Sequence, residues 1–257
     1  QMGTLVAALL AAIVIPLAGW RAAFIFGVIP VILAYFVRRH LPETKSWQNA
    51  HAIDDEKHVR PRMTVLMNTP KTALITLGLT IMSAVQVAGY YGLMNWLPSL
   101  LEQKQGLSVS GSSLWMISTI IGMSLGMLSF GKLFDKFGSR TTYSVFLIMS
   151  GLSVTLYTFV HSAFLMLLIG AIVGFFANGM NAGYGALISS FYPTEIRSFA
   201  NNAIFNTGRA VGGLSTILVG YIIDRSGFSA ALLCLGALYL ISLVIVNLIP
   251  NPVTKQS

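Results

Sequence analysis

Long uncharged stretches separated by short polar segments dominate the chain. About 20 apolar residues, each rising about 1.5 Å along a helix, cross a hydrocarbon core of about 30 Å. One uncharged stretch, residues 141–194, is too long for a single crossing, and His161 to Ala163 predicts a tight turn between two. The pattern therefore predicts eight membrane helices, at residues 2–18, 22–37, 72–98, 112–131, 142–160, 164–190, 199–222 and 229–249.

The fold class follows from the length and composition of these stretches. Apolar residues make up 55% of the chain and charged residues 9%, whereas soluble domains average about 25% charged residues. The stretches are far longer than the strands of a membrane barrel and lack their alternation of apolar and polar positions. Lipid offers the backbone no hydrogen bonds, so a membrane-spanning segment must be a helix or part of a closed barrel, and here the helix is the structure that fits. We predict an all-α membrane protein, a polytopic helical bundle.

Lysine and arginine residues are concentrated in alternate loops, which accounts for the net charge of +8. If both ends of the chain face the cytoplasm, twelve of these residues lie in inner segments and three in outer loops, and only Arg209 lies within a predicted span. Positive residues favour the cytoplasmic side. We therefore expect cytoplasmic ends and a location in the cell membrane, the bacterial inner membrane. No concentrated basic face is left for a nucleic-acid partner.

One long polar segment, residues 38–71, divides the predicted helices into two before it and six after it. We predict that this segment is a cytoplasmic central loop. Because transporters are commonly built from duplicated halves, residues 1–37 are expected to be the last two helices of an N-terminal six-helix half. Residues 72–257 are expected to be the C-terminal six-helix half. Eight helices of a total of twelve would then be present.

Neither a metal nor a cofactor is expected. Three histidines of the central loop, His40, His51 and His58, have spacings that match no usual ligand motif. The stretch from Gly126 nearly matches a phosphate-binding loop, but Leu133 stands where a hydroxyl must reach magnesium. A predicted membrane helix precedes it instead of a strand.

Four segments resemble the major facilitator superfamily in order and spacing. "GKLFDKFGSR" (Gly131–Arg140) is similar to the loop pattern G-x-L-x-D-x-x-G-x-R of that superfamily. The other three are "GWRAAFIFGVIPVILAYFVRRHLPET", "YYGLMNWLP" and "FYPTEIRSFANNAIFNTGRAVGG". The resemblance covers essentially the whole chain, as helices five to twelve. It implies a secondary transporter that works by alternating access, most like the metabolite and aromatic-acid proton symporters, including relatives that take up sialic acid.

Polar groups inside the predicted spans are candidates for binding the solute, because polar side chains in a bilayer are costly unless paired. Asn202, Asn206, Arg209 and Gly213 are separated by steps of four, three and four residues, which places them on one helical face. Arg209 is roughly 18 Å along the helix from Arg197, too deep to reach back to the cytoplasm. We expect its forked guanidinium to hold an anionic solute such as a carboxylate. The alternative is a structural arginine bonded to backbone carbonyls or to the absent helices.

Other polar and aromatic side chains also fall at helical spacing. Asn178, Asn181 and Gly185 form a second polar stripe, and Tyr184 follows Asn181 by three residues. These groups can line a central cavity, or they can hold the bundle together through interhelical hydrogen bonds. The candidate solute-binding residues are Gln86, Tyr90, Tyr91, Asn95, Asn178, Asn181, Tyr184, Asn202, Asn206 and Arg209.

A second candidate set lies in two short inner loops that carry complementary charges. We expect its four charged residues to form a cluster that holds the inner side closed and biases the conformational equilibrium, and its two glycines to let the helix ends approach closely. The set comprises Gly131, Asp135, Gly138, Arg140, Glu195 and Arg197. Close packing of neighbouring helices is predicted by G-x-x-x-G spacing at Gly122 and Gly126, Gly170 and Gly174, Gly179 and Gly183, and Gly208 and Gly212.

The sequence thus predicts a symporter of a small organic solute, an organic acid or a sugar-acid-like metabolite, and not an enzyme. Protons are the expected coupling ion, and their carboxylate should lie in the absent helices because no Asp or Glu lies deep in the eight spans. The expected partners are the solute, protons and the lipid bilayer, and the chain is expected to be a monomer. Sugar uptake, drug efflux, a non-transporting receptor and an intramembrane enzyme remain the alternatives.

Overall fold

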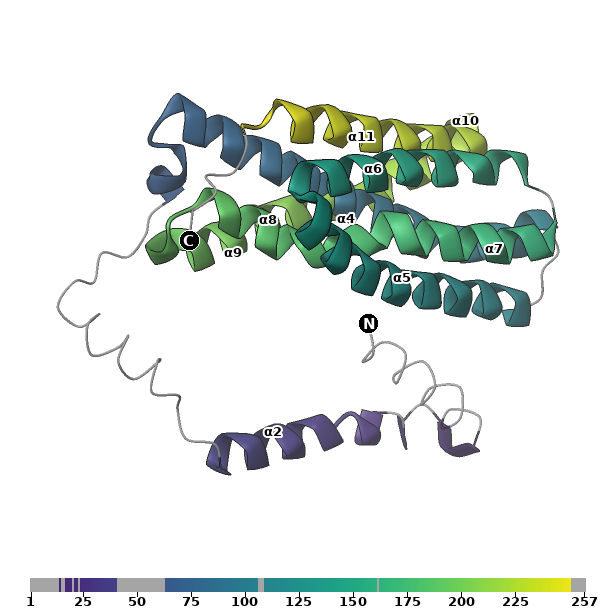
Figure 1. Cartoon of the computed structure of the whole chain (residues 1–257). Coiled ribbons are helices and arrows are strands. Elements are labelled where there is room, and N and C mark those ends of the chain that lie inside the picture. The colour runs from purple at the N-terminus through teal and green to yellow at the C-terminus, as the bar shows by residue number, and fades with distance from the viewer. Residues whose placement is uncertain are drawn as a thin grey trace. The chain divides into compact units, whose positions relative to one another are not determined.

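The computed structural model describes residues 24–40, 63–105, 109–160 and 162–250, together with residues 14, 17–19, 21 and 22. Contacts divide the chain into two compact units, residues 1–60 and 61–257. In the first unit α2 (Ile29–His40), labelled in Figure 1, follows a turn at residues 27 and 28. The predicted helix 22–37 is therefore interrupted near its start and continues past its predicted end. The predicted helix 2–18 lies largely outside the described residues.

The second unit is a bundle of helices (Figure 1). Its elements are η1 (Met63–Met67), α4 (Pro70–Gln105), α5 (Val109–Phe137), α6 (Ser139–Leu156), η2 (Tyr157–Phe159), α7 (Ala163–Val173), η3 (Gly174–Asn178), η4 (Gly179–Gly183), α8 (Tyr184–Phe191), α9 (Thr194–Gly213), α10 (Ser215–Ser226) and α11 (Phe228–Leu248). The part of the chain that the structure describes contains no strand. The prediction of an all-helical fold is confirmed.

Five helical stretches of the described chain are long and apolar enough to cross a membrane: 70–96, 114–137, 139–159, 164–191 and 228–248. Each overlaps a predicted span. The predicted span 199–222 is not among them, because the structure divides it at Leu214. The amide of Leu214 donates to the carbonyl of Val211 in a three-residue turn. This turn separates a polar helix, α9, from the short helix α10.

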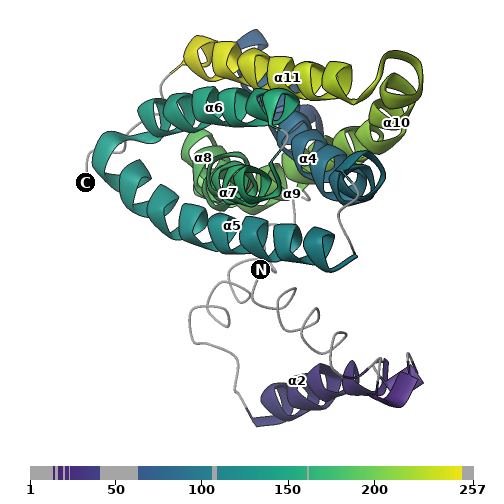
Figure 2. The ribbon, with the colours of Figure 1, turned by 90° about the vertical axis from the view of Figure 1, so that its right-hand side faces the viewer.

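The bundle is arranged around the stretch from α7 to α8. Figure 2, which looks along the bundle, shows this stretch between α5 and α6, with α11 beyond α6 and with α9 beside α4. Aromatic side chains fill the space between α5, α6 and α8. Phe130 packs edge-on against Tyr143 and Phe146, and Tyr143 packs edge-on against Tyr184. All four are fully buried, so these rings fix how the three helices fit together.

The predicted helix 164–190 is not a regular α-helix. A π-helical segment, η3, and a 3-10 segment, η4, separate α7 from α8. Their glycines lie against the neighbouring helix, and a Cβ built on Gly179 would come within 2.8 Å of the backbone of Gly126. Such close packing constrains the backbone more strongly than local helix propensity does. Mid-helix π-bulges are typical of functional sites.

Backbone contact between helices confirms the predicted role of two glycine pairs. A Cβ on Gly122 or on Gly126 would overlap a backbone carbonyl of the α7–η3 stretch. Gly208 and Gly212 of α9 likewise lie against α4, where a Cβ on Gly212 would approach the carbonyl oxygen of Ala84 to 2.6 Å. Glycine permits these approaches because it carries no side chain.

The turn between α5 and α6 is a single residue. Gly138 has a φ of 80°, a left-handed conformation that L side chains rarely adopt. The predicted loop between residues 131 and 142 is therefore almost entirely helical, since α5 runs to Phe137 and α6 starts at Ser139.

Candidate functional site

The surface of the second unit is divided into an apolar part and a polar part. Large apolar side chains are exposed along α5, α6, α10 and α11. Residues 169–210, all of them described by the structure, expose no large apolar side chain. Their exposed residues are Ala182, Gly185, Ala186, Pro193, Thr194, Glu195, Ser198, Asn202, Asn206, Thr207, Arg209 and Ala210. We call this the α8–α9 surface; its composition suits water or another protein segment better than lipid.

The polar face predicted for residues 202–213 is present on α9. Asn202, Asn206 and Arg209 are exposed, whereas Ile204, Gly208 and other residues of the opposite face are buried against α4. The amide of Asn202 donates to the carbonyl of Ser198, at 3.0 Å. Helical periodicity thus separates the packed face of α9 from its polar face.

Arg209 is the cation of this face. It lies midway in the sequence between Thr194, where α9 begins, and Ser226, where α10 ends. At the usual helical rise it is about 22 Å from the start of α9. Its guanidinium lies 6.0 Å from the ring centroid of Phe205. Within the described residues it makes no ion pair and no hydrogen bond. The guanidinium can therefore offer its donors to an anion.

Three candidates lie in the C-terminal half of α4. Tyr90 and Tyr91 are half-buried, and their rings meet edge to face with centroids 5.3 Å apart. Asn95 is exposed and its amide lies 3.4 Å from the hydroxyl of Thr216 on α10. The structure thus ties Asn95 to α10 and leaves the two tyrosines partly accessible.

The other candidates lie deeper in the bundle. Gln86, Asn178 and Tyr184 are buried, and Asn181 is half-buried. The stripe predicted through Asn178, Asn181 and Gly185 assumed a regular helix; because η3 and η4 change the residues per turn, its members range from buried to exposed. The solute-binding role of every candidate remains a prediction.

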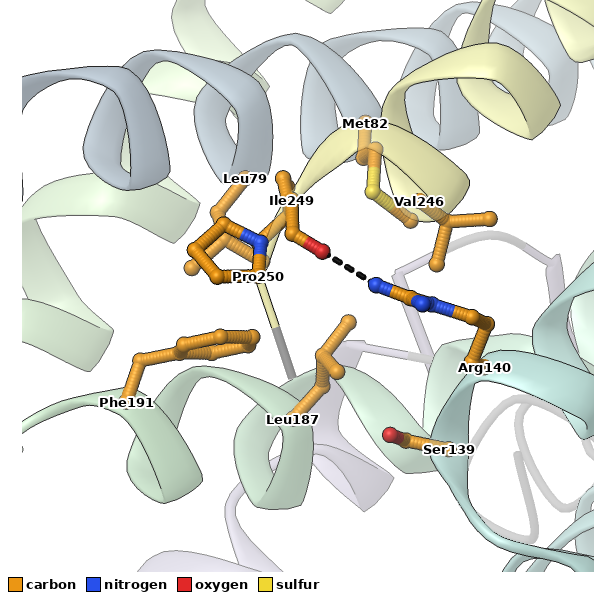
Figure 3. A pocket seen from close by; sticks show the side chains of 9 residues that line it. All are labelled: Leu79, Met82, Ser139, Arg140, Leu187, Phe191, Val246, Ile249 and Pro250. Atoms are coloured by element: carbon orange, nitrogen blue, oxygen red, sulfur yellow. Dashed lines mark hydrogen bonds between the residues drawn. The ribbon is translucent and has the colours of Figure 1, made fainter. Parts of the chain in front are cut away.

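Arg140, from the predicted gating set, joins two helix ends. Figure 3 shows its guanidinium crossing a small cavity to donate to the carbonyl of Ile249, one residue beyond α11. Leu79 of α4 and Leu187 of α8 line the same cavity. The guanidinium thereby caps the C-terminal end of α11, where backbone carbonyls lack helical partners.

The charge cluster expected at this end is absent from the structure. No ion pair joins Asp135, Arg140, Glu195 and Arg197 in the chain as described. Asp135 and Glu195 are exposed, and Arg197 donates through Nε to the carbonyl of Tyr192, at 3.4 Å. Gly131 is exposed with nothing against it. Both arginines cap backbone carbonyls instead, which a loop motif alone does not reveal.

A hydrogen-bond network that the sequence did not indicate lies at the same end. The hydroxyl of Thr76 is 2.6 Å from the carbonyl oxygen of Leu66 and 2.8 Å from the hydroxyl of Tyr192. Burial raises the pKa of the Tyr192 phenol, and the hydrogen bond with Thr76 opposes that rise. The phenol therefore stays protonated at neutral pH and can donate. The network joins η1, α4 and the C-terminal end of α8.

Comparison of the sequence with known proteins gives a match to one family. The family model described as Major Facilitator Superfamily matches residues 1–133 and 79–257. A protein of Haemophilus influenzae whose name assigns it to metabolite transport is 38% identical, over 98% of this chain and 63% of its own length.

Two further relatives have names that specify a solute. The cis,cis-muconate transport protein of Acinetobacter baylyi is 28% identical over 95% of this chain and 60% of its own length. The 3-(3-hydroxy-phenyl)propionate transporter of Escherichia coli is 32% identical over 78% of this chain and 48% of its own length. The chain thus spans about half to two thirds of the length of these relatives.

Proposed function

Because the chain belongs to the major facilitator superfamily, we propose that the full-length protein is a secondary transporter that moves a small organic solute by alternating access. The chain is a multi-pass membrane protein, and its relatives carry names of transporters. The two six-helix halves, of which residues 72–257 form the second, would enclose the solute between them. Neither half would need an enzymatic centre.

The α8–α9 surface is the observation that carries this proposal. A helix packed against lipid exposes large apolar side chains, as α5, α6 and α11 do. The α8–α9 surface instead exposes amides, hydroxyls, small residues and Arg209. Intramembrane polar residues normally face the bundle interior or a water-filled cavity. The α8–α9 surface therefore fits the wall of a solute pathway between the two halves.

The solute is proposed to be an organic acid. The guanidinium of Arg209, midway along α9 and α10, makes no hydrogen bond to any residue that the structure describes. A guanidinium binds a carboxylate through two parallel hydrogen bonds. The half-buried rings of Tyr90 and Tyr91 can stack on a planar or unsaturated solute. The names of two relatives, which specify muconate and a phenylpropionate, agree with this class.

We further propose that transport is coupled to protons, that both ends of the chain face the cytoplasm, and that the α5–α6 turn is part of the inner gate. The acidic residues of 72–257 are Glu102, Asp135, Glu195 and Asp224, all near helix ends. The proton-binding carboxylate would accordingly lie outside this sequence. Both ends would face the cytoplasm and the protein would act as a monomer in the cell membrane. The short turn at Gly138 and the capping arginine Arg140 would move with the inner gate.

Uptake by vesicles tests this function directly. Full-length protein reconstituted in liposomes should accumulate radiolabelled cis,cis-muconate or 3-(3-hydroxyphenyl)propionate when the outside is made acidic. A protonophore should abolish the accumulation because it removes the gradient. Uptake that equilibrates without accumulating would refute proton coupling. No entry of either acid, with entry of a neutral sugar or a cationic drug, would refute the organic-acid assignment.

A further inference from the structure

The break between α7 and α8 lies at mid-membrane depth. Ala177 is at the centre of the stretch 164–191. In the first part of the break, η3, the amide of Gly179 donates to the carbonyl of Gly174, five residues back. In the 3-10 segment that follows, amides donate three residues back. This change of spacing leaves carbonyls between the two patterns without a backbone donor, and an unpaired backbone carbonyl in lipid is costly.

Side chains from two neighbouring helices donate hydrogen bonds to carbonyls of the break. Gln86 of α4 donates through Nε2 to the carbonyl of Ala177, at 2.5 Å. Tyr143 of α6 donates to the carbonyl of Met180, at 3.3 Å. Both side chains are almost completely buried. The break is therefore held by specific partners, and Gln86 is one of them.

A second hydrogen bond ties α4 to the other side of the break. The phenol of Tyr184, the first residue of α8, donates to the carbonyl of Met82, at 3.0 Å. Met82 and Gln86 are one turn apart on α4, so one stripe of that helix contacts both sides of the break. Gln86 Oε1 and Asn178 Oδ1 are buried and have no hydrogen-bond partner among the described residues. Two further acceptors thus lie beside the break, unused in this conformation.

The break also determines where the α8–α9 surface lies. Gly185 and Ala186 belong to α8, directly after the break, and α8 packs on α9. A change in the break would tilt α8 and shift this surface relative to α7. Gln86, with 2% of its surface exposed, is poorly placed to touch a solute and well placed to control this change.

We propose that Gln86 is a positioning residue of the transport cycle and not a solute ligand: its amide holds the α7–α8 break in register with α4. Its role in the cycle rests on the transport function proposed above. The hydrogen bond itself is a property of the fold and can be tested separately.

Hydrogen exchange on the full-length protein in lipid nanodiscs provides that test. Gln86→Met keeps the side-chain length and removes the donor, whereas Gln86→Glu can donate when protonated. We expect Gln86→Met to speed amide exchange in residues 177–191 by about threefold to tenfold, since a hydrogen bond between membrane helices is modest in strength. Gln86→Glu should restore much of the protection. Cis,cis-muconate affinity should change by less than about threefold, while uptake slows about tenfold because the cycle is impaired.

Ser118→Ala is the matched control. The hydroxyl of Ser118 on α5 donates to the carbonyl of Leu167 on α7, at 2.7 Å, outside the break. Its removal should leave exchange in residues 177–191 unchanged. Loss of muconate binding in Gln86→Met, with unchanged exchange, would make Gln86 a solute ligand and overturn the proposal. Unchanged exchange with unchanged binding would also overturn it. If the wild type fails to transport but Gln86→Met still exchanges faster, the transport function fails and the assignment of Gln86 to the break stands.

Discussion

Replacing Arg209 with glutamine is expected to weaken binding of an organic acid to the full-length protein by about 30- to 1000-fold, which corresponds to about 2–4 kcal/mol. The guanidinium is the cation of the α8–α9 surface, and within the described residues it has no bonded partner to replace. Without the guanidinium, a bound carboxylate would lose a charge-assisted hydrogen bond and the positive charge that balances its own. Equilibrium binding of cis,cis-muconate, measured by calorimetry in detergent, gives the affinities.

A lysine variant separates the contribution of the positive charge of Arg209 from that of its forked donors. Arg209→Lys keeps the charge and loses the paired donors, so its affinity should lie between those of the wild type and Arg209→Gln. Arg225→Gln is the matched control, because Arg225 is an exposed arginine at the end of α10 that donates to Tyr221. It should change affinity by less than about threefold. Equal affinities for the wild type and Arg209→Gln would exclude Arg209 as the anion ligand.

Replacing Gly126 with alanine is expected to give one of the largest losses of stability among single methyl additions in the described bundle. The added Cβ would overlap the carbonyl of Phe175, a backbone atom that cannot rotate away. Gly179 is also packed against the backbone of Gly126, so α5 would have to move from the whole η3–η4 stretch. We expect a cost of about 3 kcal/mol or more, in the range of severe overpacking. Thermal unfolding of the purified full-length protein measures this cost.

Gly185→Ala provides the control for helix propensity. Gly185 lies within α8, is exposed, and a Cβ there would meet nothing within 4 Å. Alanine favours a helix over glycine by about 0.5–1 kcal/mol, so this variant should unfold at the same or a higher temperature. If Gly126→Ala unfolds no earlier than Gly185→Ala, then α5 does not meet η3 and η4 through its backbone at Gly126.

Most of the helices could be predicted from the sequence, because a helix that crosses lipid must be apolar and nearly free of charge along its whole length. Each of the five stretches that can span a membrane overlaps a predicted span. The break at Gly174–Gly183 could not be predicted, since it results from the packing of glycines against α5. The turn at Leu214, which divides one predicted helix into α9 and α10, also leaves no mark in the hydropathy pattern and could not be predicted from it.

The candidate site was predictable where periodicity alone decides exposure. The spacing of Asn202, Asn206 and Arg209 defined a polar face, and the structure leaves that face exposed. For Gln86 and Asn178 the same reasoning could not separate a cavity wall from a buried bond, because the outcome depends on neighbours far apart in sequence. Gln86 donates to Ala177, 91 residues away. Arg140, from the predicted gating set, likewise has a partner far away in the sequence, the carbonyl of Ile249 just beyond α11.

Whether the polar face of α9 borders water within the membrane can be measured by cysteine accessibility in the full-length protein. The test compares Asn206→Cys with Leu240→Cys, an apolar exposed position near the middle of α11, in a background where Cys234 and any other reactive cysteine are replaced. We predict that Asn206→Cys reacts with a membrane-impermeant thiol reagent, that added cis,cis-muconate slows this reaction, and that Leu240→Cys stays unmodified. Modification of Leu240→Cys with an inert Asn206→Cys would contradict a solute pathway along this face.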